Sequence, residues 1–145
     1  MRDLPRQLTV EELAELFEGR TRFVERLAGV EDPLGRAREL ARDLTDREKK
    51  EVLDAHPAIG APRLSARSAA EQGADDDPGL LAELAELNRT YEERFGFRFV
   101  VFVDRRPKRE IVAVLRERLG RREEQELETA LDELVSIAQD RWRRG

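Results

Sequence analysis

The sequence contains no cysteine, and it has one histidine, one methionine, one tryptophan and one tyrosine among 145 residues. The absence of cysteine excludes disulfide bonds, a thiolate nucleophile and a Cys-ligated metal. With a single histidine, a conventional structural zinc site is excluded as well. No apolar run approaches the ~20 residues of a membrane-spanning helix, and the N-terminus has no signal-peptide hydrophobic region. We therefore expect a soluble, cytoplasmic protein with no membrane partner.

Charged residues are abundant but balanced. They make up 41% of the chain, with 27 lysines and arginines against 32 aspartates and glutamates, and the net charge is −5. Because acids and bases are interleaved, they indicate a solvated helical surface and not a nucleic-acid footprint. The length is typical of one hydrophobic core, so we expect residues 1–145 to form a single domain.

Apolar residues recur with the 3.6-residue period of helices, and capping boxes, prolines and glycines mark the helix ends. This pattern predicts an all-α bundle of about eight helices. One of them starts at Ser68, and the others are bounded by Thr9 and Gly19, Thr21 and Leu27, Pro33 and Leu44, residues 46 and 54, Pro78 and Phe95, Pro107 and Gly120, and Arg122 and Arg143.

One segment departs from the helical pattern. Residues 97–103 read Phe-Arg-Phe-Val-Val-Phe-Val, the only cluster of β-branched and aromatic residues in the chain, and we expect a short strand or an extended segment threaded through the core. An isolated strand has no neighbour, so its N–H and C=O groups must meet helix ends, water or a bound ligand. The last possibility makes residues 99–103 a candidate pocket wall.

His56 is the only histidine and lies where the predicted helix 46–54 ends. Pro57 disfavours α geometry at the residue before it, and Gly60 and Pro62 keep the following chain irregular, so we expect a loop to present the imidazole. An unperturbed imidazole has a pKa of about 6.5, which suits it to proton transfer near neutral pH. A surface histidine that merely ends a helix is the alternative.

Ser68-Ala-Ala-Glu71 has the pattern of a capping box, and Gln72 follows it directly. Capping alone would account for Ser68 and Glu71. It leaves Gln72 unexplained, together with the short distance in sequence to His56. Because the N-terminus of a helix offers free amide donors, these residues are candidates for binding an anionic ligand.

Two polar residues lie on apolar helix faces. Asn88 interrupts the stripe of the helix from Pro78 to Phe95, and we interpret it as a structural anchor in preference to a ligand contact. Arg141 prolongs the stripe of the last helix beyond Ile137 and Ala138. Either this helix outruns the core, or the arginine belongs to a site; the spacing favours neither.

These features combine into four motifs in a fixed order. The motifs are His56-Pro57 with Ile59-Gly60, then Ser68-x-x-Glu71-Gln72, then Leu87-Asn88-x-x-Tyr91-x-x-x-Phe95-Gly96-Phe97-x-Phe99-Val100, and finally Ile137-Ala138-x-x-Arg141. Together they resemble the OHCU decarboxylase family, over roughly residues 45–142. Its enzymes act on 2-oxo-4-hydroxy-4-carboxy-5-ureidoimidazoline (OHCU), the last intermediate of urate oxidation, and release (S)-allantoin.

The resemblance implies an all-helical fold, no metal or cofactor, a small ureide as substrate and a homodimer. It also implies roles for individual residues. His56 corresponds to the catalytic proton donor, with Glu71 and Arg141 as its catalytic partners. The residues implied in substrate binding are Pro57, Ser68, Glu71, Gln72, Phe99, Val100, Val101, Phe102 and Val103.

The chain departs from the family pattern in three places. The loop between His56 and Ser68 is shorter than usual, Arg98 replaces the usual proline, and Asp104-Arg105-Arg106 replaces small residues. We interpret Arg98 as an outward-facing strand residue. The shorter loop leaves open a different or related substrate, and so a sister enzyme that acts on another carboxylated heterocycle or small acid. A separate alternative is a non-catalytic helical interaction module.

Overall fold

The computed structural model describes residues 2–58 and 77–145. Within these ranges the chain forms seven α-helices and no strand. The helices are α1 (Val10–Phe17), α2 (Arg22–Leu27), α3 (Pro33–Arg42), α4 (Asp46–Ala55), α6 (Pro78–Phe95), α7 (Lys108–Leu119) and α8 (Glu123–Arg144). The all-α class predicted from the sequence is confirmed. The further helix expected from Ser68 onward lies outside the described residues.

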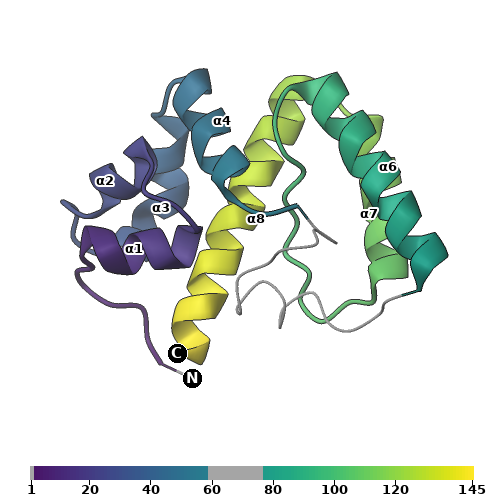
Figure 1. Cartoon of the computed structure of the whole chain (residues 1–145). Coiled ribbons are helices and arrows are strands. Elements are labelled where there is room, and N and C mark those ends of the chain that lie inside the picture. Colours follow the sequence, from purple (N-terminus) through teal and green to yellow (C-terminus); the bar gives the residue numbers. More distant parts are fainter. Residues whose placement is uncertain (1, 59–76) are drawn as a thin grey trace.

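The long helix α8 is the central element (Figure 1). It packs against α1, α3 and α4 on one side, and α6 and α7 pack against each other on its other side. The two chain ends lie together, since the indole of Trp142 donates a hydrogen bond of 2.8 Å to the carbonyl of Asp3. None of the helices described is long and apolar enough to cross a bilayer.

Local signals at both ends of α4 determine where the chain leaves this helix. At its start, the amide of Glu48 donates to the hydroxyl of Thr45 and the amide of Thr45 donates to the carboxylate of Glu48, forming the predicted capping box. The helix ends at Ala55. His56 has extended geometry, with φ −79° and ψ 136°, because Pro57 disfavours a helical residue before it. His56 therefore lies at the exit of α4, as predicted.

Residues 97–103 form the predicted extended segment, with neither helix nor strand geometry. The segment runs beside α8, between this helix and the pair formed by α6 and α7 (Figure 1). Its backbone binds side chains from the helices around it. The N–H of Arg98 donates to the carboxylate of Asp54 at 3.1 Å. The guanidinium of Arg118 donates to the carbonyl of Val100 at 2.8 Å. Side chains, and not only helix ends, water or a ligand, thus bind the backbone groups of this segment.

The backbone conformation at the end of α6, where the extended segment begins, can be tested by substitution. Gly96 follows the helix with φ +78°, and an added Cβ would meet no atom closer than 3.7 Å. Gly96→Ala should therefore lower the free energy of unfolding by about 1–2 kcal/mol through backbone strain and not through a clash. Urea denaturation measures the change.

Gly120→Ala is the matched control. Gly120 also follows a helix, but its φ is −86°, a conformation that alanine adopts without strain. The same change there should leave the free energy of unfolding unaltered or raise it by up to ~1 kcal/mol. Equal losses at the two glycines would contradict the left-handed turn at Gly96.

Candidate functional site

His56 is buried at the exit of α4, with 7% of its surface exposed. Its Nδ1 has no hydrogen-bond partner within the part of the chain that the structure describes. Burial, followed by the positive charges of Arg141 and Arg98, lowers the pKa of the imidazole from 6.5 to about 3. In these surroundings the side chain is neutral at pH 7. The expectation of an imidazole that titrates near neutral pH is therefore wrong for the protein without a ligand.

Arg141 is buried in the last turns of α8, with 1% of its surface exposed. Its guanidinium donates a hydrogen bond of 2.9 Å to the carbonyl of Leu16 at the end of α1, and it forms an ion pair of 3.3 Å with Glu18. These contacts offset the cost of burying the charge. The interpretation that α8 outruns the core is wrong. Arg141 instead brings a cation close enough to His56 to lower its pKa.

Pro57 and Arg98 also lie near the histidine. Pro57 follows His56 and is half-buried. The guanidinium of Arg98 donates a hydrogen bond of 2.7 Å to the carbonyl of His56. The interpretation of Arg98 as an outward-facing residue is wrong, because the segment is not a strand and its side chains do not alternate between two faces.

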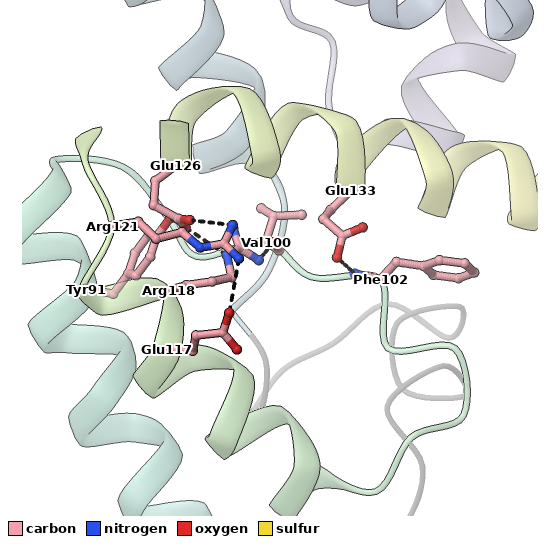
Figure 2. A network of polar contacts seen from close by, with 8 residues as sticks. All are labelled: Tyr91, Val100, Phe102, Glu117, Arg118, Arg121, Glu126 and Glu133. Atoms are coloured by element: carbon pink, nitrogen blue, oxygen red, sulfur yellow. Dashed lines mark hydrogen bonds and ion pairs between the residues drawn. The ribbon is translucent and has the colours of Figure 1, made fainter. Parts of the chain in front are cut away.

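The extended segment contributes both buried side chains and fixed backbone groups. Phe99, Val100, Val101 and Val103 are buried, and Phe102 is half-buried. Figure 2 shows the ring of Phe102 pointing away from the polar cluster around Val100. The N–H of Phe102 donates to the carboxylate of Glu133 on α8 at 3.4 Å. Each of these residues was a predicted substrate contact, and the structure places them along one path beside α8.

A buried polar network holds this segment in place (Figure 2). Glu126 on α8 is fully buried, and its carboxylate accepts a hydrogen bond of 2.7 Å from Arg118 on α7. The same oxygen accepts a bond of 2.6 Å from the hydroxyl of Tyr91. Burial and the bond to Glu126 raise the pKa of Tyr91 above its ordinary value, so the hydroxyl keeps its proton and donates. Helices α6, α7 and α8 thus meet at one carboxylate.

Arg118 links this network to the extended segment. Its guanidinium donates to the carbonyl of Val100 at 2.8 Å and lies 4.6 Å from the centre of the Phe99 ring. A second cation, Arg121, approaches the other oxygen of Glu126 at 3.7 Å. The network therefore fixes where the extended segment lies along the axis of α8.

Sequence reasoning missed this network, although a signal was present. Arg118 continues the apolar face formed by Ile111 and Leu115, with helical spacing. Glu126 likewise precedes Ala130 by one turn on the inward face of α8. A charged residue on an apolar face implies a buried partner, and here each residue is the partner of the other.

Three of the predicted site residues, Ser68, Glu71 and Gln72, lie outside the described residues. Across residues 2–58 and 77–145, no group of three or more histidine, cysteine, aspartate or glutamate side chains could hold a metal ion.

A groove of about 330 Å³ lies between α3, α4 and α8, near the start of α4 and so away from His56. Its walls carry opposite charges that pair across it, such as Arg42 with Glu128 at 3.4 Å and Lys50 with Glu123 at 3.7 Å. Because these charges already satisfy one another, the groove is a weaker candidate than the surroundings of His56.

The role of the buried network can be tested by removing its acid. Glu126→Ala leaves the buried Arg118 without its counter-ion, so we expect the free energy of unfolding to fall by about 3–5 kcal/mol. Glu117→Ala is the control, because Glu117 pairs with Arg121 at 3.2 Å but is 71% exposed. That variant should lose less than ~1 kcal/mol. Urea denaturation that finds similar small losses in both variants would contradict a structural role for the network.

Comparison with known proteins agrees with this geometry. A sequence profile described as OHCU decarboxylase matches residues 2–143. A protein of Haloferax volcanii named 2-oxo-4-hydroxy-4-carboxy-5-ureidoimidazoline decarboxylase is 37% identical over 114 residues, which cover 74% of this chain and 68% of that protein. A protein of the same name from Amia calva is 43% identical over 63 residues, 43% of this chain and 36% of that protein.

The uric acid degradation bifunctional protein PucL of Bacillus subtilis is 29% identical over 147 residues, which cover 93% of this chain and 30% of that longer protein. Among solved structures, a crystal structure of OHCU decarboxylase in the presence of (S)-allantoin has the same fold, with a TM-score of 0.76 and 24% identity over 92% of this chain and 96% of that one. Since the family profile spans nearly the whole sequence, this chain belongs to the OHCU decarboxylase family.

Proposed function

We propose that this chain decarboxylates OHCU to (S)-allantoin, with His56 as the proton donor. The observation that carries the proposal is a lone histidine buried beside a buried arginine in a chain of this family. The relatives that bear the name of this activity support the choice of substrate. The proposal treats residues 1–145 as one catalytic domain.

The reaction makes three demands on a site. The bond between the ring carbon and the carboxylate breaks, CO₂ leaves, and the electron pair passes into the adjoining carbonyl or imine system. A proton must then reach one face of a ring carbon to produce a single enantiomer. The site must therefore hold an anion, stabilise the charge as it moves, and supply a proton from a fixed position.

The low pKa of His56 couples proton supply to substrate binding. Burial, followed by the positive charges of Arg141 and Arg98, disfavours a charged imidazole in the protein without a ligand. A substrate carboxylate that binds near them offsets their charge and raises the pKa of His56. The imidazolium is then less unfavourable when an anion is present, and it protonates the ring carbon after CO₂ leaves.

The remaining roles extend this proposal to the other predicted residues. Glu71 orients His56 or binds the ureido N–H groups, while Ser68 and Gln72 hold the ring and its tail. Backbone amides of the segment 99–103 and the guanidinium of Arg141 stabilise the developing charge. Pro57 shapes the wall beside the imidazole.

We also propose that the protein works as a homodimer in the cytoplasm. Members of this family are commonly homodimers, and a chain without cysteine has no need of an oxidising compartment. Light scattering of the purified protein measures the oligomeric state.

His56→Asn tests the proposed function directly. With OHCU freshly generated from urate, the parent protein should speed the formation of (S)-allantoin, whereas the variant should lose turnover by about 10²- to 10⁴-fold because its general acid is gone. Substrate binding should change less than turnover. Circular dichroism of the product separates catalysis from spontaneous decay, which gives a racemic product.

Arg47→Asn, an exposed position on the same helix, is the control for α4 and should keep the parent's turnover. Thermal unfolding checks that both variants are folded. A parent protein that gives racemic allantoin at the spontaneous rate would favour a sister enzyme with another substrate, and full activity in His56→Asn would refute the role of the histidine.

A further inference from the structure

Arg98 makes four polar contacts around the exit of α4. Its side chain donates hydrogen bonds to the carbonyl of His56 at 2.7 Å and to the carbonyl of Asp54 at 3.2 Å. Its Nε donates to the carboxylate of Glu92 on α6 at 3.0 Å. Its own N–H donates to the carboxylate of Asp54 at 3.1 Å. One residue of the extended segment therefore joins the ends of two helices.

The carbonyls that Arg98 binds are ones that α4 itself leaves without partners. The last carbonyls of a helix have no amide one turn further on, and Pro57 prevents the helix from continuing and has no N–H to offer. A guanidinium presents several donors in a rigid plane, so it can bind two carbonyls at once. Nη1 of Arg98 binds the carbonyls on both sides of Ala55.

We infer that Arg98 is a positioning residue for His56, fixing the backbone from which the imidazole is presented. This inference rests on the proposed function, in which His56 delivers a proton to one face of a ring carbon. The contact is to the histidine's own carbonyl, so loss of the guanidinium removes a restraint on the backbone of the proton donor.

Because Arg98 is partly exposed, its effect on turnover can be distinguished from its effect on the free energy of unfolding. Its side chain is 30% exposed and that of Glu92 is 42% exposed, and ion pairs this accessible to solvent contribute little to folding. A small displacement of a catalytic group, in contrast, lowers the rate by as much as ~10²-fold. Loss of Arg98 should therefore affect turnover more than unfolding.

The test compares Arg98→Lys, Arg98→Met and a control, Arg94→Met. Lysine keeps the positive charge but not the planar donors, whereas methionine removes both. Arg94 is an exposed residue near the end of α6 that donates to the carbonyl of Arg121 at 3.2 Å and has no described contact with α4. We expect kcat to fall by about 10- to 10²-fold in both Arg98 variants, with a smaller change in KM, and to stay unchanged in Arg94→Met.

A spectroscopic readout accompanies the kinetics. Because the chain has one histidine, its imidazole Cε1–H gives one NMR resonance that needs no assignment among others. At pH 7 this resonance should move or broaden in both Arg98 variants and stay unchanged in Arg94→Met. A merely structural role, seen as a small loss of thermal stability, would not move it.

The outcomes separate this inference from the proposed function. If the parent decarboxylates OHCU but both Arg98 variants keep its kcat, or Arg94→Met loses as much as they do, the inference is overturned and the proposed function stands. If the parent shows no such activity, the proposed function fails, and the Cε1–H resonance alone tests whether Arg98 positions His56. A shift confined to the Arg98 variants supports positioning of His56, and an unchanged resonance in them overturns it.

Discussion

The arrangement of the extended segment depends on the ion pair between Arg118 and Glu126, buried between α7 and α8. A buried ion pair is stable only where good geometry and further hydrogen bonds offset the cost of taking its charges out of water. The hydroxyl of Tyr91 donates to one carboxylate oxygen of Glu126 and the carbonyl of Val100 accepts from Nη1 of Arg118, so the pair holds α6 and the segment as well as its own two helices. Nη2 of Arg118 and Oε2 of Glu126 have no hydrogen-bond partner among the described residues, although Arg121 approaches that oxygen at 3.7 Å. Near its other end, α8 carries Arg141, which holds the end of α1 in the same way.

In the candidate site, too, charged groups have hydrogen-bond partners within the protein. His56 is surrounded by groups that are already committed: Arg141 binds the end of α1, and Arg98 binds the end of α4. Both remain positively charged, and their fields reach the buried imidazole. In the proposed mechanism, an anion that enters the site offsets these charges and makes protonation of His56 less unfavourable, which ties the chemistry to the presence of the substrate. The fold thus supplies two positive charges near His56, and the proposed substrate supplies the negative charge that offsets them.

Much of the fold follows from local signals. The capping box at Thr45 and the proline after His56 place α4 and its exit, and the aromatic run from Phe97 marks a segment that is not helical. The contacts of Arg98 could not be predicted in this way, since alternation along a strand assumes a sheet that the chain does not form. The partner of Arg141 was equally hidden, because it is a carbonyl at the end of α1, 125 residues away in sequence. Ser68, Glu71 and Gln72 remain predictions.

We propose that His56 is neutral in the empty site and gains its proton when the substrate binds. Because burial and two cations lower its pKa in the folded chain from 6.5 to about 3, folding stability is unaffected by His56 above pH 6.5 and decreases as the pH falls from there towards 3. NMR titration of the Cε1–H resonance tests this most directly. We expect a neutral imidazole from pH 8 to pH 5 in the free protein, and a higher pKa of His56 with an unreactive ureido carboxylate such as allantoate bound. A free imidazole that titrates near pH 6.5 and does not respond to the bound anion would contradict it.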